Sequence, residues 1–186
     1  MQEKQVTVDG KTHELPLPFM VCATQNPVEL AGTYPLPEAQ LDRFLIRISM
    51  GYPSKDDEVS ILEKNRINSS SSEIKPIATA EDIFELYRIV NSVKCTHGIL
   101  TYIVDLAGYT RTHEDISLGA SPRASIALVR SSMGLALMRG RDYVIPDDVQ
   151  YMLKPVFAHR LVLNPHAHVR NQTVENVLKS AISCSG

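Results

Sequence analysis

The chain has 186 residues, of which 44 % are hydrophobic and 22 % charged, and it carries a formal net charge of −2 with an isoelectric point near 6.3. This balance is typical of a soluble globular protein, and it provides no general attraction to nucleic acid or an anionic membrane. No apolar run approaches the roughly 18 residues that span a bilayer, and the first ten residues do not resemble a secretory signal. Cys22, Cys95 and Cys184 are widely spaced without a CxxC pair, which argues against a disulfide framework or zinc site and fits a reducing cytoplasm.

The N-terminal segment predicts a β-hairpin followed by a buried strand. Residues 5–8 alternate in polarity, Asp9-Gly10 is a tight-turn signal, and residues 11–15 can return as a second strand. The apolar run Phe19–Ala23 is typical of a strand buried on both faces of a parallel sheet. Asn26 follows its carboxyl end, where open α/β sheets bind ligands. An Asn there can contact a phosphate and an attacking water, but a turn Asn before proline is equally common.

The next segment predicts a short helix and another strand. After a Gly- and Pro-rich loop, Glu38–Phe44 is expected to be helical, and Ile46–Met50 alternates as a strand with one more polar face. With Leu41 and Phe44 on the buried side, Arg43 projects outward, where a guanidinium could neutralise charge on a neighbour's γ-phosphate. The alternative is a solvated arginine paired with the adjacent aspartate, Asp42. Arg47, on the exposed face of the following strand, is a second candidate.

Beyond residue 53 the apolar period becomes helical. Ser54 with Asp57 and Thr79 with Asp82 resemble capping boxes, and the first of these helices is expected to turn Val59 and Leu62 inward. Pro122 and Pro146 suit first-turn helix positions. The sequence thus predicts a β-rich part, 1–52, and an all-helical part, 53–186, with helices at 54–66, from 79 onward, and at His97–Thr112, Pro122–Met138, Pro146–Phe157 and about Thr173–Ser183.

The segment Gly119–Ala124 contains a third candidate site, after Asn26 and Arg43. Ser121 can cap a helix and Pro122 can begin it, which leaves Arg123 in the first turn, the unfavourable end of the helix dipole for a cation. An anion shared by Arg123 and the helix N-terminus would remove that conflict. The alternative is a tolerated misplacement that costs about 0.3–1 kcal/mol at an exposed site.

Several other patterns are weak. Gly10-Lys11-Thr12 imitates the end of a P-loop but lies in the hairpin turn, and Tyr102–Asp105 imitates a magnesium-binding strand end but lies in a helical period. His166 and His168 lack a third ligand at metal spacing, so no metal site is expected.

Seven segments occur along the chain in this order: VTVDG, ATQNP, GTYPLPEAQLDRF, ISMGYP, GASPRA, RDYVIPDDV and AHRL. Together they resemble MoxR-type AAA+ ATPases over nearly the whole chain. The resemblance implies an α/β fragment of an AAA+ P-loop core, with a β-hairpin and two core strands, followed by a helical lid. It implies that Asn26 is sensor 1, Arg43 an arginine finger acting across a subunit interface, and Arg123 sensor 2, in cis or in trans. The hairpin corresponds to the pre-sensor-1 hairpin that faces the pore of a ring.

The same resemblance places the P-loop and the Walker-B acids in a preceding half of the parent protein. The parent would use ATP and Mg²⁺ in a hexameric homo-oligomeric ring, acting like a chaperone on partners that include von Willebrand factor A domain proteins. The isolated chain is expected neither to bind ATP tightly nor to hydrolyse it, and to self-associate through Phe19–Ala23 or be disordered there. The alternatives are a nucleotide-independent helical interaction module and, third, a nucleic-acid binder, which the acidic isoelectric point disfavours.

Overall fold

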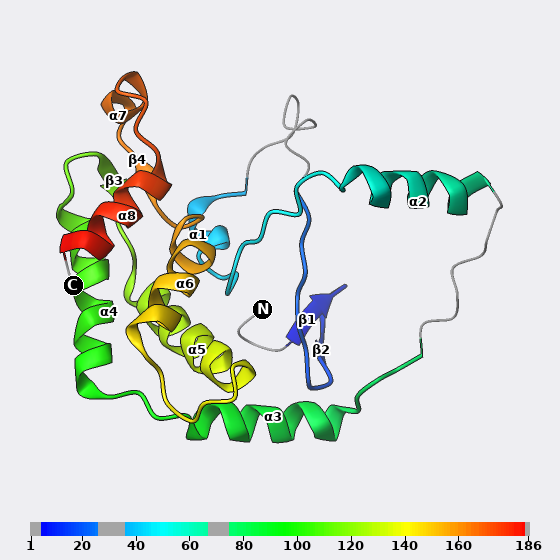
Figure 1. The fold of residues 1–186 in the computed structure, drawn as a ribbon. Coiled ribbons are helices and arrows are strands. Elements are labelled where there is room, and N and C mark those ends of the chain that lie inside the picture. Colours follow the sequence, from blue (N-terminus) through cyan, green and yellow to red (C-terminus); the bar gives the residue numbers. More distant parts are fainter. Residues whose placement is uncertain (1–4, 26–35, 67–74, 185–186) are drawn as a thin grey trace.

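The computed structural model describes residues 5–25, 36–66 and 75–184. It is mostly helical, with two small antiparallel pairs of strands, β1–β2 and β3–β4. The elements in chain order are β1 Gln5–Val8, β2 Lys11–Glu14, α1 Glu38–Leu41, α2 Lys55–Arg66, α3 Ala80–Ser92, α4 His97–Thr112, β3 Ile116–Leu118, α5 Pro122–Met138, α6 Pro146–Phe157, β4 Val162–Leu163, α7 Pro165–Val169 and α8 Val174–Cys184 (Figure 1).

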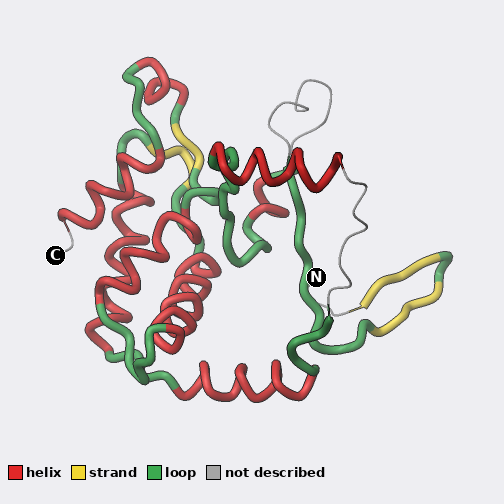
Figure 2. The backbone as a smooth tube through the Cα atoms, turned by 45° about the vertical axis from the view of Figure 1, so that its right-hand side comes forward, coloured by secondary structure: helices red, strands yellow, loops and turns green. Residues whose placement is uncertain are grey.

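The predicted N-terminal hairpin is confirmed. Strands β1 and β2 pair antiparallel from Gln5 opposite Glu14 to Val8 opposite Lys11. Asp9 and Gly10 have φ values of 52° and 74°, the two positive values that a type I′ turn requires. The hairpin projects away from the helices (Figure 2), and the sequence that imitates a P-loop lies at its turn.

The hydrophobic core lies among α4, α5, α6 and α8, which pack against one another in a bundle (Figure 1). Its largest fully buried apolar side chains include Phe157, Ile103, Leu106 and Leu128. The small β3–β4 pair and α7 close one end of this bundle. The bundle therefore provides a packed surface on which the preceding segment can dock.

Helix boundaries follow their local signals closely. The predicted limits of α4, α5 and α6 are confirmed, and α8 is displaced by one residue at each end. Thr79 forms the expected capping box with Asp82, and Ser54 accepts from the Asp57 amide at 3.2 Å. Helix α1 is shorter than predicted and ends at Leu41, followed by turns that include Phe44 N to Leu41 O at 3.1 Å.

The two expected core strands are not formed. Phe19–Ala23 and Ile46–Met50 run without strand pairing, and Met20 and Ile48 are 81 % and 68 % exposed. A strand buried on both faces needs a neighbouring strand on each edge and covering layers, and the described residues provide neither. The hairpin and the helical part that the sequence predicts are both present; the two core strands are the part of the expected architecture that the described residues do not form.

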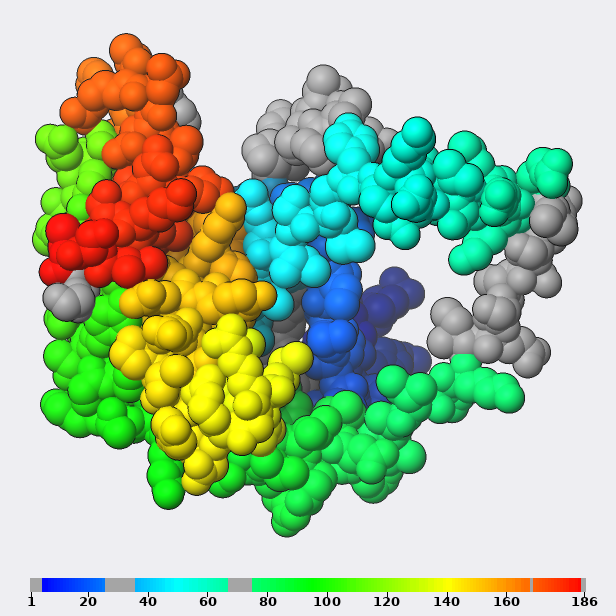
Figure 3. Space-filling model, in the orientation of Figure 1, coloured from blue at the N-terminus to red at the C-terminus, as the bar shows by residue number. Residues whose placement is uncertain are grey.

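Two helices also lie outside the core. Val59 and Leu62 of α2 were expected to face inward, but they are 46 % and 65 % exposed, and neither α2 nor α3 contains a buried residue. Figure 3 shows α2 standing away from the packed bundle. Periodicity identifies the apolar face of a helix but does not supply the surface that covers it.

No helix in the described ranges is long and apolar enough to cross a membrane. The three cysteines are unpaired, and within those same ranges no group of three or more His, Cys, Asp or Glu side chains could hold a metal ion.

Candidate functional site

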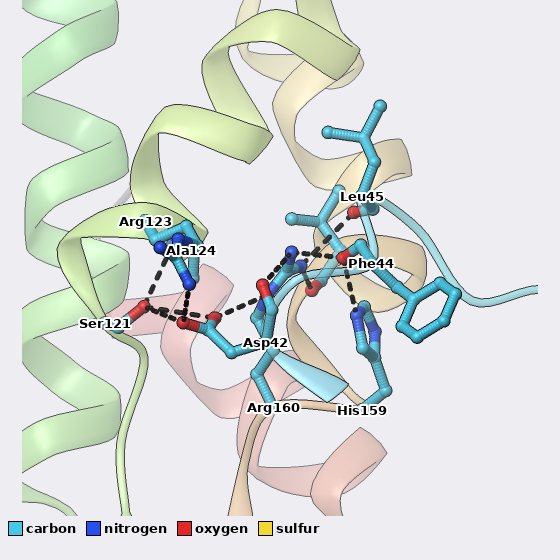
Figure 4. A network of polar contacts seen from close by, with 9 residues as sticks. Asp42, Phe44, Leu45, Ser121, Arg123, Ala124, His159 and Arg160 are labelled. Carbon is cyan, nitrogen blue, oxygen red and sulfur yellow. Dashed lines mark hydrogen bonds and ion pairs between the residues drawn. The ribbon is translucent and has the colours of Figure 1, made fainter. Parts of the chain in front are cut away.

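Asp42, directly after α1, is the point at which the N-terminal part of the chain docks on the helical bundle. Its carboxylate accepts from Arg160 Nε at 3.0 Å and from Ser121 Oγ at 3.2 Å, and it lies 3.7 Å from an Arg123 guanidinium nitrogen (Figure 4). Asp42 was considered as a partner for a solvated Arg43, but its carboxylate pairs with Arg160 and Arg123 instead, while Arg43 is exposed. Asp42 faces the lid because two lid arginines and a lid hydroxyl lie on that side.

Arg160 uses all five of its N–H groups, four of them in this contact. Nε donates to the Asp42 carboxylate, and the two terminal nitrogens donate to the carbonyls of Asp42, Phe44, Leu45 and Val156. The side chain is only 3 % exposed. Burial lowers the pKa of Arg160 from its ordinary value, and the hydrogen bond and charge of Asp42 oppose that shift. The guanidinium stays protonated, since arginine does not lose its proton in proteins.

His159 strengthens the same docking. Its Nε2 lies 3.2 Å from the Phe44 carbonyl oxygen, an arrangement that requires the proton on Nε2, and its buried Nδ1 has no partner within the described structure. Burial is the main cause that lowers the pKa of His159, and the charge of Arg160 adds to it. His159 is therefore a neutral donor at neutral pH.

The loop before α5 is held by α4. The Ala120 amide donates to Thr110 Oγ1 at 3.0 Å, and Arg111 Nε donates to the Ala120 carbonyl at 2.8 Å. Gly119 lies so close to α4 that an added Cβ would be 2.7 Å from the Arg111 Cα. These contacts fix Ser121, which caps α5 by accepting from the Ala124 amide at 3.2 Å.

Arg123 lies in the first turn of α5, as predicted, with its side chain 41 % exposed. The anion that faces it in this structure is the Asp42 carboxylate. The two charged groups are 3.7 Å apart, and the Arg123 side chain is partly exposed to solvent at this position.

Arg43 points to the other side of α1. It is exposed and lines a hollow of about 480 Å³ with Ala23, Leu36, Gln40 and Phe44. A second hollow of about 290 Å³, lined by Asp42, Ser121 and Arg160 among others, lies on the lid side. Among the described residues the Arg43 side chain makes no hydrogen bond or ion pair. Asp42 and Arg43, which are adjacent and oppositely charged, therefore lie on two different surfaces.

The remaining predicted residues are placed differently. Asn26 lies outside the described residues. Arg47 is anchored through its backbone amide, which donates to the Pro155 carbonyl at 2.9 Å. Burial is the main cause that lowers the pKa of His159, and a backbone hydrogen bond is the main cause that lowers the pKa of Glu175; the charge of Arg47 adds a smaller lowering to both. The structure thus brings Arg123 and Asp42 together and places Arg47 against the lid.

Sequence reasoning missed Asp42, His159 and Arg160 as one unit. A signal was present, because His159 and Arg160 interrupt an apolar stretch that runs from Val156-Phe157 to Leu161. Polar residues buried within such a stretch need partners. Their partner is 118 residues away, so the sequence pattern could not identify it.

Comparisons with known proteins agree with this architecture. A model of the AAA lid domain matches residues 108–181, and one of the ATPase family associated with various cellular activities (AAA) matches residues 1–46. The uncharacterized protein YeaC of Bacillus subtilis is 45 % identical over 98 % of this chain and 57 % of its own length. Chaperone MoxR1 of Mycobacterium tuberculosis is 42 % identical over 88 % of this chain and 45 % of its own.

A solved structure from Cytophaga hutchinsonii, assigned provisionally as an ATPase, matches with a TM-score of 0.88 at 34 % identity. The match covers 98 % of this chain and 58 % of that one. The chain thus spans about half the length of the relatives it matches.

The two family models match two successive parts of AAA+ ATPases, and the relatives match nearly the whole chain, which is therefore part of an AAA+ ATPase and carries the lid. Within that family it corresponds to the C-terminal part of a MoxR-type ATPase. The family resemblance stated from the sequence is confirmed, whereas the roles of individual residues and the division at residue 52 remain predictions.

Proposed function

We propose that this chain supplies the charges that sense ATP and assist its hydrolysis in a MoxR-type ATPase. Arg43 acts as the arginine finger on the nucleotide of a neighbouring subunit, Arg123 as sensor 2 and Asn26 as sensor 1. The observation that carries the proposal is the outward orientation of Arg43 from a segment that Asp42 and Arg160 fix on the lid. A finger must be exposed to reach another subunit, and its backbone must be held.

The chemistry is stabilisation of charge. In phosphoryl transfer, negative charge spreads over the equatorial oxygens of the transferred group, and a positioned guanidinium lowers the barrier. Mg²⁺, bound by other parts of the parent, would neutralise charge between the β- and γ-phosphates. Arg123 lies beside the N-terminus of α5, where amide groups favour an anion. A phosphate oxygen there would exchange with the Asp42 carboxylate.

The intact ATPase is proposed to form a homo-oligomeric, hexameric ring in the cytoplasm. It would use ATP and Mg²⁺ to remodel or assemble partner complexes, with von Willebrand factor A domain proteins as clients. The support is the family and, among its members, a relative named as a chaperone. The net charge of −2 does not favour nucleic acid as a client.

The trans role of Arg43 is tested in the full-length ATPase. Arg43→Ala is expected to lower the turnover number by about 10³-fold or more, the scale of arginine-finger contributions, while ATP still binds. Arg130→Ala, at another exposed arginine on the lid helix α5, is the control and should keep its activity. Mixing Arg43→Ala subunits with subunits mutated in the P-loop should restore turnover, because each supplies what the other lacks. Mixed rings that assemble but remain inactive would refute the trans assignment.

A second candidate is a nucleotide-independent interaction module. It is favoured by the lid bundle, which has its own buried core within this chain. The chain alone should neither hydrolyse Mg-ATP nor bind it tightly, because it supplies no phosphate cradle. Micromolar affinity in a calorimetric titration would contradict this, whereas binding of a client without nucleotide would favour the module.

A further inference from the structure

The segment around Arg43 is held on both sides by a single side chain. Arg160 contacts the carboxylate and carbonyl of Asp42 before Arg43, and the carbonyls of Phe44 and Leu45 after it. Figure 4 shows the guanidinium of Arg160 enclosed by this stretch of backbone. The Arg43 backbone is therefore clamped, while its side chain stays exposed.

Stability alone is a weak reason for such an arrangement. A buried ion pair contributes little beyond what well-packed apolar residues of equal volume would give, because both charges lose their hydration. A guanidinium with five satisfied donors instead defines one geometry, since its donors form a rigid planar fork. The arrangement is suited to fixing the direction of the chain at residues 42–45.

Asp42 also connects this clamp to Arg123. Its carboxylate bonds Arg160 through Oδ1, contacts Ser121 through both oxygens and pairs with Arg123 through Oδ2. An anion that draws Arg123 away would leave Asp42 with Arg160 and Ser121 alone. Asp42 and Arg43 lie in the turn that follows α1, where the Arg43 amide donates to the Gln40 carbonyl at 3.2 Å, so a rotation of this backbone that re-aims Asp42 also re-aims Arg43.

We propose that Asp42 and Arg160 are positioning residues for Arg43, and that Asp42 couples the lid arginine Arg123 to the direction in which Arg43 points. This inference rests on the proposed role of Arg43 as a finger. It assigns to Asp42 an effect on catalysis in the neighbouring subunit, although Asp42 itself faces its own lid. Occupancy of Arg123 by phosphate in one subunit is thereby transmitted to the finger that the same subunit offers to the next.

The variant that tests this is Asp42→Asn in the full-length ATPase. The amide keeps the shape and the hydrogen bond with Ser121 but removes the charge that Arg160 and Arg123 share. The turnover number is expected to fall about 10- to 100-fold, the scale of a misplacement near 1 Å, while the Kd for a fluorescent Mg-ATP analogue changes less than about threefold. Glu38→Gln is the matched control: it removes the same charge four residues earlier, in α1, at an exposed residue without an ion pair in the described structure, and should leave both values unchanged.

The decisive measurement is rescue in mixed rings. When Asp42→Asn subunits are mixed with P-loop mutant subunits, whose Asp42 and Arg43 are intact, turnover per Asp42→Asn subunit should recover as it does for Arg43→Ala. If Asp42 acts only on nucleotide in its own subunit, or only on folding, no recovery occurs and the inference is overturned. Unchanged turnover in Asp42→Asn rings would also overturn it. If Arg43→Ala itself is not rescued in the parallel mixture, the proposed finger role fails instead.

Discussion

Replacing Arg160 with lysine tests how much of the docking depends on the fork of the guanidinium. Lysine keeps the positive charge and most of the length but offers three donors from one nitrogen in place of five spread over three. It can keep the ion pair with Asp42 and one carbonyl contact, so three of the five hydrogen bonds are lost. Hydrogen bonds to charged groups contribute about 1.5–3 kcal/mol each in favourable cases, and ordinary ones about 0.5–1.5 kcal/mol. We therefore expect Arg160→Lys to lower the free energy of unfolding by about 2–4 kcal/mol.

The measurement is urea denaturation of the 186-residue chain followed by far-ultraviolet circular dichroism, with the m-value checked for constancy. Arg88→Lys is the control, because Arg88 pairs with Glu85 on the exposed surface of α3 with its side chain 77 % exposed. It should change stability by less than about 0.5 kcal/mol. Hydrogen exchange should also accelerate at the Arg47 amide, which donates to Pro155 only while the segment is docked.

The reasoning is refuted if Arg160→Lys costs less than about 1 kcal/mol at an unchanged m-value. That outcome would mean that water replaces the lost carbonyl contacts at little cost. The low exposure of the Arg160 side chain argues against it, because carbonyls around a buried group have little access to water.

Two further predictions concern the same platform. His159 is buried with a lowered pKa, so the unfolded chain binds more protons, and stability should decline as pH falls below the ordinary histidine value of 6.5. His159→Gln, which can keep a donor to the Phe44 carbonyl, should flatten the change in urea midpoint between pH 7.5 and about 5.5, and equal slopes for the two proteins would contradict this. Gly119→Ala places a Cβ 2.7 Å from the Arg111 Cα and should cost about 1–3 kcal/mol. Gly108→Ala, with nothing within 4 Å inside α4, should be neutral or stabilising by up to about 1 kcal/mol in the same titration, and similar losses for both would exclude the steric explanation.

The sequence predicted best what depends on neighbours along the chain. Thr79 with Asp82 and Ser121 before Pro122 are local capping signals, and the helices they begin start where predicted. The hairpin at Asp9-Gly10 is equally local, because two residues with positive φ determine the turn.

Features that depend on distant partners could not be predicted in the same way. Phe19–Ala23 has the composition of a buried strand, but pairing requires other strands, and the described residues contain none beside it. The contact of Asp42 with Arg160 could not be predicted for the opposite reason: the partner is present, but it is 118 residues away in the sequence. The outward direction of Arg43 was predicted from Leu41 and Phe44 and agrees with the structure, in which both are partly buried and Arg43 is exposed. Its catalytic role stays a prediction.

The position of Asp42 beside Arg43 also constrains how such a site can be altered. One turn of chain presents a carboxylate to the lid and a guanidinium to the opposite side, so the two cannot move independently. A substitution on the lid side, at Arg160 or Ser121, is therefore expected to change the direction of Arg43, the proposed finger, without touching it. Conversely, removing the Arg43 side chain leaves the docking intact, because the clamp holds backbone carbonyls and Asp42. Loss of the Arg43 side chain and loss of its direction are thus separable. Removing the side chain should leave the stability of the chain unchanged, whereas disturbing the contacts that direct it should lower that stability.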